Sequence, residues 1–161
     1  MKKKDVQITT RNTEETFQLG KHFVSFLSKG DVVALYGELG SGKTVFVKGA
    51  CSGLGIEKEV TSPSFILMQK YIGKVQVYHF DFYRITSEPE IEALDIENYF
   101  YSDGISFIEW PEIADFLLPE STFKIFFKRS IKNNNVVEGV RVITITVPRN
   151  RRISGYESFG S

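Results

Sequence analysis

Apolar side chains near the start of the chain recur first at every second position and then at helical spacing. The alternation around Val6–Ile8 predicts a short strand. From residue 17 to residue 27 the apolar positions recur every three or four residues, which predicts a helix. Asn12 followed by Glu15 resembles a capping box at the start of that helix, and Gly30 is in position to end it.

A continuous apolar run and a second helical pattern follow. Val32–Tyr36 is apolar throughout, as expected of a strand that is buried on both faces. The helix predicted after it has an inward stripe of Phe46, Ala50 and Leu54 and ends at Gly55. The strand and the helix are joined by a glycine-rich turn.

Two strand-like runs in the middle of the chain are separated by a very short connection. They cover Phe65–Tyr71 and Val75–Tyr83, with only Ile72–Lys74 between them. Because three residues cannot cross over a sheet, the two strands should pair antiparallel. The predicted sheet therefore departs from a purely parallel, doubly wound arrangement.

Beyond residue 85 the pattern predicts a helix, a strand and a short helical piece. Ser87 and Glu90 form a second capping-box pattern, which opens a helix toward Tyr99. The compact apolar run Ile105–Glu109 predicts a strand that ends in a carboxylate. A short helical piece is predicted around residues 113–117.

The last apolar pattern predicts a β-hairpin. Phe123–Lys128 and Val140–Val147 should pair around the polar turn Lys132–Asn135. Since no linker separates two parts of the chain, residues 1–148 are expected to form a single domain. Residues 149–161, rich in arginine, glycine and serine, are expected to form a basic, flexible tail.

Composition narrows the classes of partner and compartment. Twenty basic and twenty acidic residues give no net charge, whereas proteins that bind nucleic acid on their own usually carry a basic excess. Any role with RNA is therefore expected to involve a partner protein. The single cysteine, Cys51, excludes an intrachain disulfide and should be packed in the core. Neither a membrane-spanning run nor a signal peptide is recognisable, so the expected location is the cytoplasm.

The strongest chemical signal is Gly37–Thr44, which reads GxxxxGK[ST] between the predicted buried strand and its helix. Glycines let successive N–H groups point at phosphates, and the positive end of the following helix adds to this attraction. In such a loop Lys43 reaches the β and γ phosphates, and the Thr44 hydroxyl is a ligand of Mg²⁺. The sequence therefore predicts a nucleotide site, with an ordinary glycine-rich turn as the alternative.

A P-loop enzyme also needs a carboxylate near Mg²⁺ and a group that positions the attacking water. Glu109 ends an apolar strand, and Asp81 shares one side of its strand with His79. The alternatives are a solvated strand end for Glu109, an exposed edge for Asp81 and a structural role for His79. Arg84 could neutralise phosphate charge, contact a partner or form a surface pair. The NKxD signature of GTPases is absent from the sequence, which favours ATP.

Four blocks of the sequence, in this order, resemble the TsaE (YjeE) family of bacterial ATPases required for threonylcarbamoyladenosine modification of tRNA. The blocks are Gly37–Thr44, Val60–Phe65, Tyr78–Arg84 and Ile108–Glu112. They are similar to the family's loop and to its V-x-S-P-T-[FY], H-x-D-x-Y-R and E-W-P segments. Ser64 stands where the family usually has Thr, which keeps the hydroxyl.

The resemblance implies an α/β, P-loop NTPase-like fold with a central mixed sheet, parallel and antiparallel, flanked by helices. It assigns Thr44 and Glu109 to Mg²⁺, and Lys43, Asp81 and Glu109 to the hydrolysis of ATP. The segment 61–65 resembles a switch-like loop near the γ-phosphate. The residues expected to contact the nucleotide are Gly37, Glu38, Leu39, Gly40, Ser41, Gly42, Lys43, Thr44, Val45, Thr61, Asp81 and Trp110, with Thr13 and Arg141 as further candidates.

The resemblance also implies partners. The family is understood to act with the TsaD and TsaB proteins, so the ATPase is expected to be slow alone, and tRNA to be reached only through the complex. The modified base would be the adenosine next to the anticodon. A small-molecule kinase and a non-hydrolysing nucleotide sensor are the alternatives.

Basic residues gather near the predicted hairpin and tail. They suggest a face for a protein partner or for tRNA, or simply a solvated hairpin edge. These residues are Lys128, Arg129, Lys132, Arg149, Arg151 and Arg152.

Overall fold

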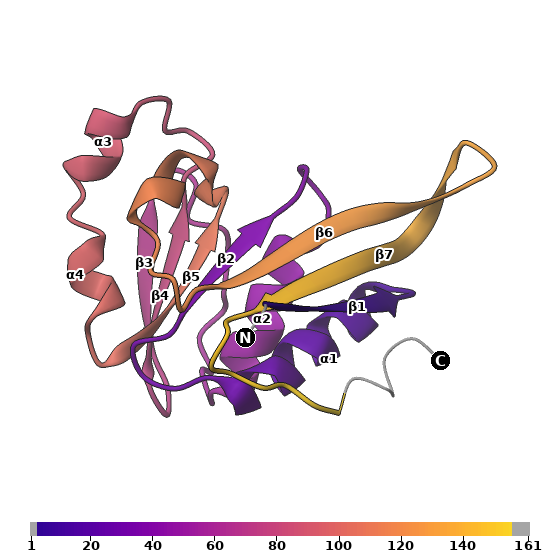
Figure 1. The fold of residues 1–161 in the computed structure, drawn as a ribbon, viewed down its shortest axis with the longest axis horizontal. Coiled ribbons are helices and arrows are strands. Elements are labelled where there is room, and N and C mark those ends of the chain that lie inside the picture. Colours follow the sequence, from indigo (N-terminus) through magenta and orange to yellow (C-terminus); the bar gives the residue numbers. More distant parts are fainter. Residues whose placement is uncertain (1–2, 156–161) are drawn as a thin grey trace.

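The computed structural model describes residues 3–155, which are built around one mixed β-sheet (Figure 1). Within these residues the sheet has seven strands in the order β1-β7-β6-β2-β5-β4-β3. The strands are β1 (Lys4–Thr10), β2 (Val32–Tyr36), β3 (Met68–Ile72), β4 (Gln76–Asp81), β5 (Gly104–Glu109), β6 (Phe123–Lys132) and β7 (Asn135–Val147).

The centre of the sheet is parallel and its margins are antiparallel. Strand β2 pairs in parallel with β5 and β6, and β5 pairs in parallel with β4. Strand β3 adds antiparallel to β4, while β7 and β1 extend the other margin. The predicted mixed sheet is thus confirmed. Since parallel strands end at the same edge, the last residues of β4 and β5, Asp81 and Glu109, lie side by side.

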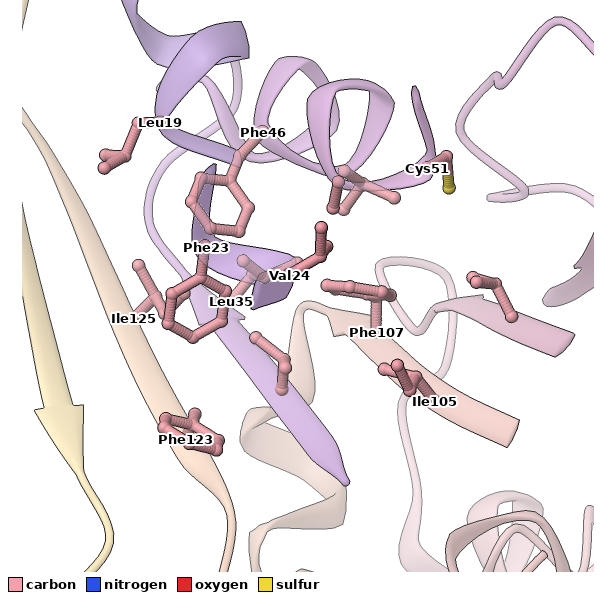
Figure 2. Close-up of a cluster of buried hydrophobic side chains, with 14 of the residues drawn as sticks. Leu19, Phe23, Val24, Leu35, Phe46, Cys51, Ile105, Phe107, Phe123 and Ile125 are labelled. Carbon is pink, nitrogen blue, oxygen red and sulfur yellow. The ribbon is translucent and has the colours of Figure 1, made fainter. Parts of the chain in front are cut away.

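Two helices cover one face of the sheet. They are α1 (Thr13–Phe23), followed by the 3₁₀ turn η1 (Val24–Phe26), and α2 (Lys43–Gly53). Figure 2 shows the core that they close. It includes the fully buried rings of Phe23, Phe46 and Phe107, and Cys51, whose expected burial is confirmed. Burial raises the pKa of the Cys51 thiol to about 12.

Shorter helical pieces cover the opposite face around β4 and β5. They are α3 (Glu88–Glu92), α4 (Glu97–Phe100) and the 3₁₀ segment η2 (Pro111–Leu117). Their core contains Phe80, Phe82 and Phe100. The structure thus buries apolar side chains on both sheet faces, which explains the uninterrupted apolar runs of β2 and β5.

The first helix begins as predicted but ends earlier. The Glu15 N–H donates to the Asn12 side chain at 2.8 Å, which caps α1. The helix ends at Phe23 rather than near Gly30. Gly30, at φ +90°, instead shapes the turn before β2, and its N–H donates to the Gly104 carbonyl at 2.7 Å.

The single helix predicted toward Tyr99 is two helices, α3 and α4. Asp95 lies between them in the left-handed region, at φ +50°, which interrupts the helical path. The Ser87 hydroxyl donates to the Glu90 carboxylate at 3.0 Å and makes no cap contact with the helix backbone.

The C-terminal hairpin is longer than predicted and projects beyond the body of the molecule (Figure 1). Asn133 and Asn134, at φ +52° and +64°, form its tip, the backbone that a two-residue type I′ turn requires. A bulge interrupts the pairing, because Ser130 on β6 stands opposite residues 137–140 on β7. Gly139 within the bulge has φ +75°.

The basic residues at the two ends of β7 do not form a single face. Lys132 lies at the hairpin tip, whereas Arg151 lies beyond the other end of β7. There the Arg151 guanidinium binds both oxygens of the Asp31 carboxylate, at 2.7 and 2.8 Å, and holds the segment to the body. The remainder of the predicted tail, residues 156–161, lies outside the described residues. No helix among residues 3–155 is long and apolar enough to cross a membrane.

Candidate functional site

The turn between β2 and α2 has the backbone that the glycine pattern predicts. Gly37, Gly40 and Gly42 have φ values of +151°, +75° and +107°, which side chains with a Cβ rarely adopt. Gly42 is the N-cap of α2, so the loop leads directly into the positive end of an eleven-residue helix. Such a backbone allows N–H groups to point into one space beside a helix terminus, as phosphate binding requires.

A cavity of about 380 Å³ opens beside this loop. Most of the predicted nucleotide contacts line it, together with Thr13 and Arg141. Gly37, Glu38 and Thr61 are not in its wall, whereas Ser62 and Ser64 are. The lining residues are Thr13, Thr16, Leu39, Gly40, Ser41, Gly42, Lys43, Thr44, Val45, Ser62, Ser64, Asp81, Glu109, Trp110, Gly139 and Arg141.

Lys43 is held at the cavity wall by the loop itself. Its ammonium donates to the carbonyls of Gly37 and Glu38 and lies 4.0 Å from the ring centroid of Trp110. Trp110 has φ +54°, a left-handed backbone just before Pro111. Burial lowers the pKa of Lys43, and the nearby Glu109 carboxylate partly opposes this shift.

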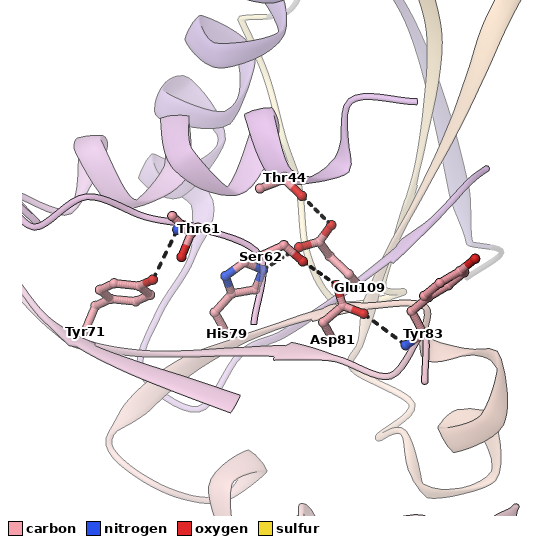
Figure 3. Close-up of polar contacts among 8 residues, drawn as sticks. All are labelled: Thr44, Thr61, Ser62, Tyr71, His79, Asp81, Tyr83 and Glu109. Atoms are coloured by element: carbon pink, nitrogen blue, oxygen red, sulfur yellow. Dashed lines mark hydrogen bonds and ion pairs between the residues drawn. The ribbon is translucent and has the colours of Figure 1, made fainter. Parts of the chain in front are cut away.

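The two predicted magnesium ligands meet at the start of α2 and the end of β5. The Thr44 hydroxyl donates to one oxygen of Glu109 at 2.8 Å, and the other oxygen lies 2.6 Å from His79 Nε2 (Figure 3). His79 is fully buried and its Nδ1 has no hydrogen-bond partner among the described residues. The sequence indicated that His79 and Asp81 share a strand face, but not that His79 reaches Glu109.

The donor set fits a magnesium ion that is also bound by phosphates. A hydroxyl and a carboxylate oxygen are ligands that Mg²⁺ accepts, usually beside waters and substrate phosphates. Across residues 3–155 no three His, Cys, Asp or Glu side chains are grouped to hold a metal by themselves. Any ion bound by Thr44 and Glu109 would therefore take its remaining ligands from waters and from the nucleotide.

Asp81 is fixed by contacts on both carboxylate oxygens. One oxygen accepts from the Ser62 hydroxyl at 2.5 Å, and the other from the Tyr83 N–H at 2.9 Å (Figure 3). Asp81 is 3% exposed and lines the cavity beside Glu109. It is therefore neither solvated nor at a free edge. Ser62 was not singled out from the sequence as a site residue, although it lies within the Val60–Phe65 block.

The segment after Ser62 turns outward before β3 begins. The strand starts at Met68 rather than Phe65, because Leu67 adopts φ +68°. Phe65 and Ile66 are consequently 80% and 63% exposed. The Arg84 guanidinium lies 3.9 Å from the Phe65 ring centroid and is not in the cavity wall. An apolar surface thus adjoins the Asp81 side of the cavity.

These elements define the class of protein. A glycine-rich loop leads into a helix, while a Thr–Glu pair and a second carboxylate meet at the ends of parallel strands. This combination is that of a P-loop nucleotide-binding protein with a mixed sheet.

Comparison with known proteins identifies the family. The family described as "Threonylcarbamoyl adenosine biosynthesis protein TsaE" matches residues 10–137. The chain belongs to this family.

Individual relatives match over nearly the whole chain. The tRNA threonylcarbamoyladenosine biosynthesis protein TsaE of Bacillus subtilis is 38% identical over 92% of this chain and 89% of its own. The protein of the same name from Treponema pallidum is 36% identical over 87% of this chain and 99% of its own. The crystal structure of Bacillus subtilis YdiB superposes with a TM-score of 0.77 and 32% identity, covering 93% and 90% of the two chains.

Proposed function

We propose that this protein binds ATP with Mg²⁺ and hydrolyses it in support of threonylcarbamoyladenosine modification of tRNA. The observation that carries the proposal is the meeting of Thr44, Glu109 and Asp81 beside the loop that holds Lys43. The names of the relatives support the tRNA pathway, and the absence of the NKxD signature supports ATP. A role in tRNA modification also supports a cytoplasmic location.

Each residue of the site has a distinct role in the proposed hydrolysis. When nucleotide binds, the Lys43 ammonium exchanges the neutral carbonyls of Gly37 and Glu38 for negatively charged phosphate oxygens, which form stronger, charge-assisted hydrogen bonds. Thr44 and Glu109 would hold Mg²⁺, which neutralises phosphate charge when bound.

Asp81 is the acceptor that orients the attacking water. Its oxygen bonded to Ser62 is the one that a movement of the 61–65 segment would release toward the cavity.

The surface beside the site supports a protein partner. Phe65, Ile66 and Tyr83 expose large apolar areas next to the 61–65 segment that contacts Asp81. Such areas are typical of docking sites. We propose that homologues of TsaD and TsaB cover them, so that docking and hydrolysis are coupled. Because the chain has no net charge, tRNA is reached through these partners rather than directly.

Asp81→Asn tests the proposed function. The variant should bind ATP within about threefold of wild type, while turnover in the complex with TsaD and TsaB homologues falls by about 100-fold or more. Binding is measured by calorimetry and turnover by phosphate release. Asp103→Asn is the matched control, because Asp103 is exposed at the opposite end of β5.

Two results would contradict the proposal. Wild-type protein that binds no ATP and shows no complex-dependent hydrolysis would exclude the function. Unchanged turnover in Asp81→Asn would instead favour a nucleotide sensor, whose bound state merely docks on a partner.

A further inference from the structure

The β6–β7 hairpin contacts the phosphate loop through two arginines. Arg129 on β6 donates from Nη2 to the Leu39 carbonyl at 3.1 Å. Arg141 on β7 donates from Nε to the Ser41 carbonyl at 3.1 Å and from Nη2 to the Gly40 carbonyl at 3.2 Å. Three consecutive loop carbonyls are therefore bound by guanidinium groups that come from about 90 and 100 residues further along the chain.

The backbone of β6 also lies directly against the loop. A Cβ at Gly37 would stand 2.8 Å from the Phe127 carbonyl, and one at Gly40 would stand 2.9 Å from Arg129 Nη2. Both distances are shorter than side-chain contacts allow. Gly37 therefore permits the β6 backbone to pack against the loop, whereas at Gly40 the close atom is the movable end of the Arg129 side chain.

The carbonyl contacts have a consequence for the N–H groups. In a trans peptide the C=O of one residue and the N–H of the next point in opposite directions. Fixing the carbonyls of Leu39 and Ser41 toward the arginines turns the N–H groups of Gly40 and Gly42 away from them. The remaining N–H, that of Ser41, closes a turn on the Glu38 carbonyl at 3.1 Å.

We propose that Arg129 and Arg141 are positioning residues that set the direction of the loop N–H groups before nucleotide binds. This inference rests on the phosphate-binding role proposed above. Arg141 also lines the cavity, and each of its three nitrogens donates to a backbone carbonyl, with Nη1 bonded to Val140 at 3.1 Å. These bonds fix the loop carbonyls, which lowers the conformational entropy that the loop loses when phosphate binds.

Charge alone is the alternative explanation, and lysine variants separate the two. A lysine keeps the positive charge but presents a single ammonium, which cannot reproduce the planar fork that spans two carbonyls. In Arg141→Lys the positioning role predicts loss of loop order, whereas a pure charge effect predicts none. Arg129→Lys is the second variant, and its exposed position makes global unfolding no concern.

The experiment measures loop order without nucleotide and affinity with it. In Arg141→Lys the ¹⁵N order parameters of the Gly40 and Gly42 amides should fall from about 0.85 to below about 0.6. The affinity for ADP should weaken about tenfold, as expected on loss of a charge-assisted hydrogen bond. The melting temperature should stay near that of wild type. Lys128→Ala, which removes a neighbouring charge on β6, should change neither the order parameters nor the affinity for ADP.

The outcomes distinguish this inference from the function it rests on. If wild type fails to bind ADP, the proposed function fails, while the order parameters of the free loop still report on the arginines. Unchanged order parameters in both lysine variants would overturn the positioning role. So would an Arg141→Lys protein that binds ADP normally when Arg141→Ala does not, because charge would then suffice.

Discussion

Among the individual residues, His79 adds to the site a contact that the Gly37–Thr44 motif does not contain. Its Nε2 lies 2.6 Å from Glu109, and its buried Nδ1 has no partner among residues 3–155. A proton on Nδ1 would be a buried donor without an acceptor, which costs more than an unused lone pair. We therefore place the proton on Nε2, where it orients Glu109, the proposed magnesium ligand.

His79→Ala is expected to weaken the magnesium-dependent part of nucleotide binding by about tenfold, because partners behind a metal ligand typically contribute that much. Calorimetry with ADP, with and without Mg²⁺, measures it. His79→Gln, whose amide can still donate to Glu109, should recover part of the loss. His22→Ala on α1 is the control. An equal loss with and without Mg²⁺ would show that His79 acts on folding rather than on the metal ligand.

How well the sequence predicts a residue's place beside the cavity depends on how far its partners lie along the chain. The positions of Lys43 and Thr44 were predictable because they belong to one continuous motif. The positions of Asp81 and Glu109 were predictable from strand alternation and from the end of a strand. The contacts of Arg129 and Arg141 were not, since they bring together residues that meet only after the sheet is complete.

At the scale of elements, α1 and α2 cross with their backbones in close approach. A Cβ at Gly49 would lie 1.9 Å from the Phe17 carbonyl, and one at Gly20 would lie 2.1 Å from the Phe46 carbonyl. Each helix thus contributes a glycine where the other passes. The helical stripe in the sequence predicted that both helices face the core, but a glycine inside a helix gave no sign of which partner it meets.

Gly49→Ala should destabilise the protein by about 2 kcal/mol or more. Alanine favours a helix by about 1 kcal/mol over glycine, but here its methyl group forces two backbones apart. Urea denaturation measures the free energy of unfolding. Lys48→Ala, at the exposed neighbouring position, should change it by less than about 0.5 kcal/mol. A stabilised Gly49→Ala protein would show that the helices can separate without loss.

Local departures from the predicted elements have a common cause. The helix toward Tyr99 breaks at Asp95, and β3 starts late because of Leu67, both of which adopt left-handed backbones. Neither an aspartate nor a leucine predicts a left-handed backbone as strongly as a glycine does. Hydrophobic periodicity therefore predicted where the elements lie, while these two boundaries depended on the backbone conformation of single residues.

In the molecule as a whole, the residues that line the cavity come from distant parts of the chain, from Thr13 on α1 to Arg141 on β7. Bound nucleotide should therefore stabilise the entire domain. At about 100 times its dissociation constant, Mg·ADP should add about 2.7 kcal/mol and raise the melting temperature by about 5–10 °C. Differential scanning calorimetry should show a single unfolding transition.

Lys43→Ala is the control for this stabilisation and should abolish the shift. Two separate transitions, of which nucleotide moves only one, would contradict a single unit.

The pairing of β1 with β7 gives the molecule a definite order of assembly during synthesis. Thr10 is aligned with Arg141, and Lys4 is aligned with Val147. Among residues 3–155, β1 is the first strand along the chain and β7 the last, so β1 can join the sheet only after β7 has been synthesised. Arg141, which lies on β7, can likewise reach the Gly37–Thr44 loop only after β7 has been made. A nascent chain therefore carries the Gly37–Thr44 motif well before the arginine that binds its carbonyls, and the loop gains that contact only after β7 has been made.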